Sequence, residues 1–137
     1  MKAFVTGGTG FLGINLIKQL ADLDWTITAI CRPNADTQEL ADIDVDWRKG
    51  HITKFDDVLD ALDDDVDVIF HLAGDTNMWR KNNARQFEVN VTATEHLVNA
   101  ALQKDIPTFI HTSSISAYGF HKEVIDEKTP STAMLSN

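Results

Sequence analysis

The 137 residues carry a formal net charge of −9, with 21 Asp and Glu against 12 Lys and Arg. This length suits one domain with its own core, and the acidic balance argues against a nucleic-acid partner, because affinity for a phosphate backbone comes mainly from clustered Lys and Arg. The single cysteine, Cys31, excludes a disulfide framework and suits a reducing compartment. No apolar stretch approaches the ~20 residues that span a bilayer, so we expect a cytoplasmic protein without a membrane partner.

Strand-like and helix-like segments alternate along the chain. Apolar and β-branched runs predict strands at residues 3–6, 26–31, 45–47, 66–72 and 108–112. Apolar residues at helical spacing predict helices at 12–23 and 84–103, and shorter ones at 37–41 and 56–62. The expected buried faces of the two long helices are Leu12, Leu16, Ile17, Leu20 and Leu23, and Phe87, Val91, Leu97, Val98 and Ala101. The pattern is typical of a doubly wound α/β domain, whose five-stranded parallel sheet has the order 3-2-1-4-5 and helices on both faces.

A glycine-rich turn connects the first strand to the first long helix. Gly7 would permit the tight turn, Gly10 would let the backbone approach a pyrophosphate, and Gly13 would let the helix pack closely on the strand. Free N–H groups and the helix dipole would attract the phosphates. The alternative is a glycine-rich turn that binds nothing. The residues expected to contact a dinucleotide here are Gly7, Thr9, Gly10, Phe11, Leu12 and Gly13.

Four motifs together carry a family resemblance. They are TGGTGFLG at residues 6–13, VIFHLAG at 68–74, NVTAT at 90–94 and HTSSISAYG at 111–119. In this order they resemble the extended short-chain dehydrogenases/reductases. DTNMW at 75–79 and CRP at 31–33 most resemble the dihydroflavonol-reductase-like branch of the NAD-dependent epimerase/dehydratase group. The resemblance covers nearly the whole chain and implies that residues 1–137 form an NAD(P)-binding Rossmann domain of an enzyme with a small-molecule substrate.

The residue that ends the second strand selects the cofactor in enzymes of this kind. An acidic side chain accepts hydrogen bonds from the ribose of NAD, whereas an arginine pairs with the 2′-phosphate of NADP. Cys31 stands in the acidic position and Arg32 follows it, which favours NADP. The alternative is that Arg32 is a solvated loop charge, because no second basic residue stands near it in the sequence.

The resemblance also implies contacts around the adenosine and the nicotinamide. The family usually has an aspartate after the third strand, but here His51, followed by Ile52, would accept the adenine hydrogen bond or stack on the ring; a plain surface histidine is equally open. The small residues after the fourth strand would pass under the ribose, and Asn90 would face the nicotinamide unless it bonds to neighbouring backbone. The further residues expected to line the cofactor site are Leu72, Ala73, Gly74, Thr112 and Ser113. His71, within an apolar run, is expected to be a core histidine.

Ser114 is the expected catalytic residue, since the matching serine of the family points its hydroxyl at the substrate carbonyl beside a tyrosine and a lysine. Tyr118 and Lys122 have the Tyr-x-x-x-Lys spacing, but Gly119 disfavours a helix that starts at Tyr118, so they are not expected to form the pair. The catalytic tyrosine helix and the substrate lobe are expected beyond residue 137. A sheet without that next helix would leave an apolar strip exposed beside the fifth strand, which favours a homodimer.

A metal site is not expected. Asp63, Asp65 and Asp67 have the alternate spacing of a calcium loop, but Val68 stands where a glycine is needed and Gly74 where a glutamate is needed. Two functions stay open: the cofactor-binding part of an NADP-dependent oxidoreductase, epimerase or dehydratase that transfers hydride at a carbonyl, secondary alcohol or nucleotide sugar, or a non-catalytic redox-sensing module.

Overall fold

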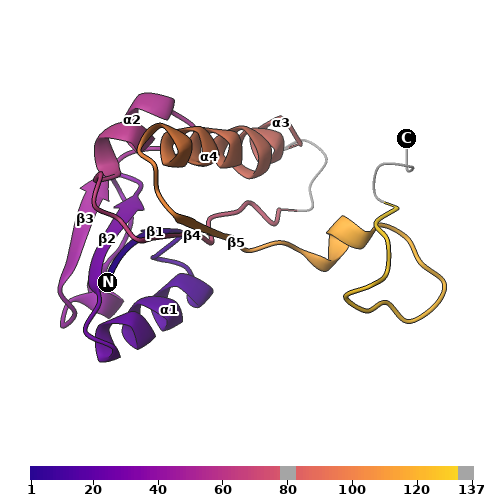
Figure 1. Cartoon of the computed structure of the whole chain (residues 1–137), viewed down its shortest axis with the longest axis horizontal. Coiled ribbons are helices and arrows are strands. Elements are labelled where there is room, and N and C mark those ends of the chain that lie inside the picture. Colours follow the sequence, from indigo (N-terminus) through magenta and orange to yellow (C-terminus); the bar gives the residue numbers. More distant parts are fainter. Residues whose placement is uncertain (78–82, 133–137) are drawn as a thin grey trace.

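The computed structural model describes residues 1–77 and 83–132. Its strands are β1 (Lys2–Thr6), β2 (Thr26–Cys31), β3 (Val45–Lys49), β4 (Val68–His71) and β5 (Thr108–His111). Its helices are α1 (Phe11–Asp22), α2 (Phe55–Ala61), α3 (Asn83–Phe87) and α4 (Ala93–Gln103), with short turns at η1 (Gln38–Leu40), η3 (Glu88–Thr92) and η4 (Ile115–Tyr118). The strands pair in parallel in the order β3-β2-β1-β4-β5, which confirms the predicted fold (Figure 1).

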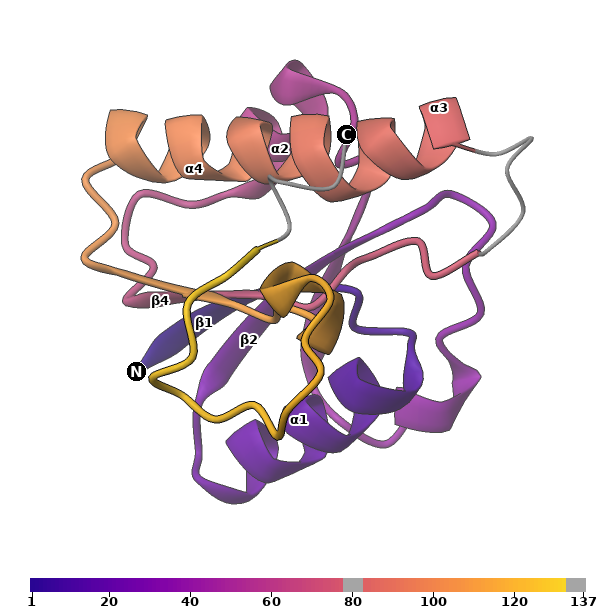
Figure 2. The ribbon, with the colours of Figure 1, turned by 90° about the vertical axis from the view of Figure 1, so that its right-hand side faces the viewer.

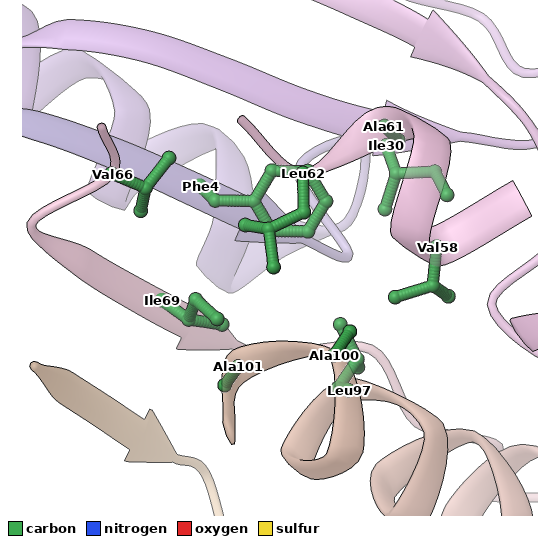
Figure 3. Packing of buried hydrophobic residues seen from close by; sticks show 10 residues of the cluster. All are labelled: Phe4, Ile30, Val58, Ala61, Leu62, Val66, Ile69, Leu97, Ala100 and Ala101. Atoms are coloured by element: carbon green, nitrogen blue, oxygen red, sulfur yellow. The ribbon is translucent and has the colours of Figure 1, made fainter. Parts of the chain in front are cut away.

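Helices cover both faces of the sheet. Helix α1 lies on one face, and α2 and α4 lie together on the other (Figures 1 and 2). The central strand β1 is apolar on both sides: Phe4 packs toward α2 and α4, as Figure 3 shows, whereas Val5 belongs to the cluster beneath α1. A strand covered on both faces must be apolar at successive positions, which explains the run that marked β1 in the sequence.

The buried faces of the two long helices differ from the expected ones. The segment predicted as one helix at 84–103 contains a π-helical turn, η3, between α3 and α4. Phe87, Val91 and Val98 are exposed, and the expectation for them was wrong. The wider turn changes the phase of the side chains before α4 relative to those within it. Val98 lies within α4, beside the buried Leu97. The residues that α4 buries are Ala93, Leu97, Ala100 and Ala101.

Helix α1 buries a narrower stripe than predicted. Ile17 and Leu20 are buried and Leu16 packs against the core, but Leu12 is 49% and Leu23 is 67% exposed. Leu12 lies in the first turn, beside the glycine-rich loop, and Leu23 lies beyond the last helical residue. The middle of the helix therefore supplies the contact with the sheet, and its first turn stays open.

Strand β5, at one edge of the sheet, is less covered than the inner strands. Phe109 packs against the cluster shared by α2 and α4, whereas Ile110 is 46% exposed and Ile115, just after the strand, is 71% exposed. An apolar strip beside the fifth strand is therefore present, as the sequence predicted. The chain after β5 runs past the carboxyl ends of the strands and away from the helices (Figure 1).

Candidate functional site

The glycine-rich turn leads from the carboxyl end of β1 into α1. Gly7 has φ +72°, in the left-handed region that favours glycine, and its carbonyl oxygen accepts a 3.0 Å hydrogen bond from the Gly10 N–H. Gly10 is the N-cap of α1, and its carbonyl oxygen accepts the first helical bond, from Ile14 N–H at 2.9 Å. No side chain caps this helix end. Its first-turn N–H groups are therefore available to an anion.

The three motif glycines meet different constraints. A Cβ at Gly7 would lie 2.7 Å from the backbone nitrogen of Ala73, and a Cβ at Gly13 would lie 2.1 Å from the carbonyl oxygen of Gly7. At these two positions the backbone packs too closely on neighbouring backbone to leave room for a side chain. A Cβ at Gly10 would meet only the Gly7 oxygen, at 3.3 Å, and Gly10 is exposed. Gly10 thus leaves open the space above the turn in which a pyrophosphate would bind, and the turn fits that group.

Thr9, Phe11 and Leu12 flank this space. Phe11 is 88% exposed in the first turn of α1. Because the side chains of Phe11 and Leu12 are apolar, these two residues can bind a phosphate only through their backbone N–H groups. Thr9 lines a cavity of about 130 Å³ with Asp36 and Glu39, which follow β2. One carboxylate oxygen of Asp36 accepts a 2.9 Å hydrogen bond from the Gln38 N–H within its own loop. The carboxylate of Asp36 is therefore already hydrogen-bonded to the backbone of its own loop.

The carboxyl end of β4 lies directly behind the turn. The Ala73 N–H donates a 3.2 Å hydrogen bond to Thr6 Oγ1, and the Leu72 N–H donates to the Thr6 carbonyl oxygen at 3.3 Å. Gly74 follows and is exposed. The structure therefore brings residues 72–74 to the edge of the glycine-rich turn, at the point where strand order reverses between β1 and β4.

Asn90 holds the loop that follows β4. Its Oδ1 accepts a 2.7 Å hydrogen bond from the Asp75 N–H, and its Nδ2 donates to the Asp75 carbonyl oxygen at 2.9 Å. Asn90 lies in the π-helical turn η3, a form often found at functional sites. These bonds reach a loop 15 positions earlier in the chain, and the role of Asn90 toward the nicotinamide stays a prediction. Met78 and Trp79, part of the branch motif, lie outside the described residues.

The end of β2 carries the residues expected to select the cofactor. Cys31 is 6% exposed, and its Sγ accepts a 3.3 Å hydrogen bond from Lys49 Nζ at the end of β3. Arg32 is exposed. The contact of Lys49 was missed in the sequence because Lys49 lies 18 positions after Cys31. Only the register of β2 against β3, which pairs these two residues, brings them together.

His51 and Ile52 have different environments. His51 is exposed, and its backbone N–H donates a 2.8 Å hydrogen bond to Asp57 Oδ2. Ile52 packs its side chain against the core beneath α2 and α4. The imidazole of His51 is therefore open to a ligand, whereas Ile52 offers one mainly its backbone.

The segment after β5 presents Thr112, Ser113 and Ser114 to solvent. The Thr112 N–H donates a 3.0 Å hydrogen bond to the His71 carbonyl oxygen, which continues the pairing of β4 and β5. Ser114 caps η4, since its Oγ accepts a 3.2 Å hydrogen bond from the Ser116 N–H. The Ser114 O–H keeps its hydrogen to donate to a carbonyl oxygen.

Tyr118 and Lys122 do not share a helix. The 3₁₀ turn η4 ends at Tyr118, and Gly119 follows with φ 76° and ψ −153°. The Tyr118 carbonyl oxygen bonds to His121 Nε2 at 2.9 Å rather than to a helical N–H. The prediction that these residues are not a Tyr-x-x-x-Lys helix pair is confirmed.

His71 is a core residue, as predicted. It is 1% exposed, and its ring nitrogens hydrogen-bond Thr6 Oγ1 at 2.7 Å and Thr94 Oγ1 at 2.9 Å. Burial, followed by the charge of His111 on β5, lowers the pKa of His71 to about 4. His71 is therefore neutral at physiological pH and ties β1, β4 and the start of α4 together.

The aspartates with calcium-loop spacing bind a lysine. Lys2 Nζ lies 3.0 Å from Asp63 Oδ2 and 2.6 Å from Asp65 Oδ1, while Asp67 Oδ2 accepts from the Lys2 backbone N–H at 2.7 Å. The hydrogen bonds to Asp65 and Asp63 raise the pKa of Lys2. These carboxylates thus fasten the amino end of β1 to the turn before β4.

Within residues 1–77 and 83–132, no helix is long and apolar enough to cross a membrane.

Known proteins resemble this chain over most of its length. A Mycobacterium tuberculosis 3 beta-hydroxysteroid dehydrogenase/Delta 5-->4-isomerase is 34% identical over 121 residues, which are 84% of this chain and 32% of that protein. A Synechocystis protein provisionally named dihydroflavonol 4-reductase is 30% identical over 85% of this chain and 33% of its own length. The chain therefore spans about a third of the length of these curated relatives.

Solved structures share the fold. The crystal structure of gox2253 is 29% identical, has a TM-score of 0.82, and matches 93% of this chain and 39% of that one. The UDP-Glc/GlcNAc 4-epimerase from Campylobacter jejuni is 21% identical with a TM-score of 0.85, over 95% of this chain and 42% of that one. The model of the NAD dependent epimerase/dehydratase family matches residues 3–136. The chain belongs to this family.

Proposed function

We propose that this chain is the cofactor-binding part of an NADP-dependent oxidoreductase, epimerase or dehydratase. The observation that carries the proposal is the glycine-rich turn, in which Gly7 packs closely on the backbone after β4 and Gly13 on the backbone of the turn, whereas the space above Gly10, at an uncapped helix start, is open. That arrangement suits the pyrophosphate of a dinucleotide. The preference for NADP rests on Cys31, in the place of an acidic residue, and on the exposed Arg32 beside it.

Different residues of the chain would bind the cofactor and orient the substrate. The nicotinamide of the bound cofactor accepts or donates a hydride. The first turn of α1 binds the pyrophosphate through its N–H groups, and Arg32 pairs with the 2′-phosphate. Ser114 donates a hydrogen bond to the substrate carbonyl. Asn90, whose amide is bonded to Asp75, acts as a positioning residue that holds the loop after β4 in place.

The family and the relatives support a proposal for the substrate class. A carbonyl, a secondary alcohol or a nucleotide sugar is the proposed substrate, since the relatives are named as a steroid dehydrogenase, a dihydroflavonol reductase and a sugar 4-epimerase. We propose that the proton-transferring Tyr-x-x-x-Lys helix and the substrate lobe belong to a longer protein. Tyr118 is the one tyrosine of the 137 residues, and its position at the end of η4 does not pair it with Lys122 on one helix.

The open glycine-rich turn also favours a second candidate, a non-catalytic module that senses the redox state by binding the dinucleotide. The two candidates differ in turnover rather than in binding. Nicotinamide absorbance at 340 nm would be followed over a panel of carbonyls and nucleotide sugars, for the 137-residue chain and for a protein extended through the following helix and lobe. Activity confined to the extended protein supports the enzyme, and binding without turnover in both supports the module. Turnover by the short chain that is lost in Tyr118→Phe would contradict both.

The cofactor preference is tested by calorimetric titration of NADPH and NADH. We expect tighter binding of NADPH, and we expect Arg32→Ala to weaken NADPH by about 1.5–3 kcal/mol, the range for a hydrogen bond to a charged group, with little effect on NADH. Equal affinities in the unmodified chain, or an NADPH affinity unchanged by Arg32→Ala, would contradict the preference.

A further inference from the structure

We propose that Lys49 is a second cation for the 2′-phosphate of NADP, acting with Arg32 at the carboxyl ends of β2 and β3. The inference rests on the proposed preference for NADP. It starts from a pairing that the sequence does not show: Cys31 and Lys49 are register partners, and Lys49 Nζ lies 3.3 Å from Cys31 Sγ.

Lys49 lies on the face of the sheet that carries the glycine-rich turn. Side chains alternate along a strand, so Lys49 shares its side of β3 with Trp47. Trp47 packs against the cluster beneath α1, and its ring would be 3.3 Å from a Cβ at Gly8 of the turn. Cys31 likewise shares its side of β2 with Ala29, which belongs to the same cluster. The Cys31–Lys49 contact is therefore on the α1 side of the sheet, where the turn would hold a dinucleotide.

The charge of Lys49 has no carboxylate partner in the described part of the chain. Its neighbour Arg48 pairs with Asp46 and Asp63 across the other face, whereas Lys49 donates to a thiol, a weak acceptor. A phosphate oxygen would replace that acceptor at little cost and gain a charge-assisted hydrogen bond. An acidic residue at position 31 would instead pair with Lys49 and neutralise it.

The position of the thiol indicates which part of the ligand Lys49 would reach. In dinucleotide-binding folds, an acidic residue about 20 positions after the glycine motif contacts the ribose 2′-hydroxyl, and Cys31 stands there. A cation 3.3 Å from this side chain is placed for a group attached at that 2′ oxygen. Arg32, the next residue, is exposed at the end of the same strand. Two cations from adjacent strands would thus flank one phosphate.

The test compares Lys49→Met with Lys49→Arg and with Lys18→Met, which removes the same charge from an exposed position midway along α1. Binding of NADPH, NADH, adenosine 2′,5′-bisphosphate and adenosine 5′-monophosphate is measured by calorimetry, with thermal unfolding to confirm folding. We expect Lys49→Met to weaken both 2′-phosphorylated ligands by about tenfold and the other two by less than about twofold. Lys49→Arg should keep most of the affinity, and Lys18→Met should leave all four affinities near their original values.

The outcomes distinguish a failure of the role of Lys49 from a failure of the proposed NADP preference. If the unmodified chain prefers NADPH and Arg32→Ala weakens that preference, but Lys49→Met does not, the role of Lys49 is refuted and the NADP preference stands. If Lys49→Met weakens all four ligands equally, Lys49 has a structural role only and the inference is also refuted. If the unmodified chain binds NADPH and NADH equally, the NADP preference itself fails.

Discussion

Gly10 and Gly13 offer a matched pair of substitutions that separates binding from folding. Gly10 has φ −90° and ψ 168°, an extended conformation that valine adopts readily, and a Cβ there meets only one atom, at 3.3 Å. Gly10→Val should therefore fold with a stability within about 1 kcal/mol of the original chain. Its side chain would fill the space above the turn, and a clash of about 1–3 kcal/mol in the bound state would weaken NADPH by about 5-fold to 150-fold.

Gly13→Ala should show the opposite pattern. Its Cβ would lie 2.1 Å from the Gly7 carbonyl oxygen and 2.7 Å from the Gly8 Cα, so helix and turn would have to separate. Overpacking of this kind costs about 1–3 kcal/mol, which would lower the melting temperature of a domain of this size by about 3–12 °C. Differential scanning calorimetry and NADPH titration measure both effects. A folded Gly10→Val with unaltered NADPH affinity would refute the reasoning, since the cofactor would then bind elsewhere.

Two further predictions concern His71 and Cys31. Because the pKa of His71 is about 4 in the folded chain and near 6.5 when unfolded, the unfolded state binds more protons between these values, and stability should fall by about 2 kcal/mol from pH 7.5 to pH 5. Urea unfolding should show this loss largely removed in His71→Gln and retained in the exposed control His51→Gln; an equal loss in both variants would contradict it. Cys31→Asp should weaken NADPH and strengthen NADH, because the new carboxylate would pair with Lys49 and could accept from the ribose hydroxyls, and an unchanged ratio of the two affinities in calorimetry would refute this account.

Local features of the site could be predicted from the sequence, and features that depend on packing or register could not. The tight turn at Gly7 and the close approach of Gly13 follow from residue types within a few positions of one another. The contact of Lys49 with Cys31 depends on how two strands align, which no local pattern specifies. The π-helical turn at η3 likewise arises in a segment whose apolar spacing reads as a regular helix, and it reversed the expected burial of Phe87.

Amide chemical-shift mapping of the ¹⁵N-labelled chain with NADPH tests most directly the claim that this chain binds a dinucleotide through its glycine-rich turn. The account predicts that the largest changes occur at residues 7–13, at Cys31 and Arg32, and at residues 72–74, with Lys49 affected by NADPH but not by NADH. Saturable binding with the largest changes on the far side of α2 and α4, or the absence of binding at millimolar NADPH, would contradict it.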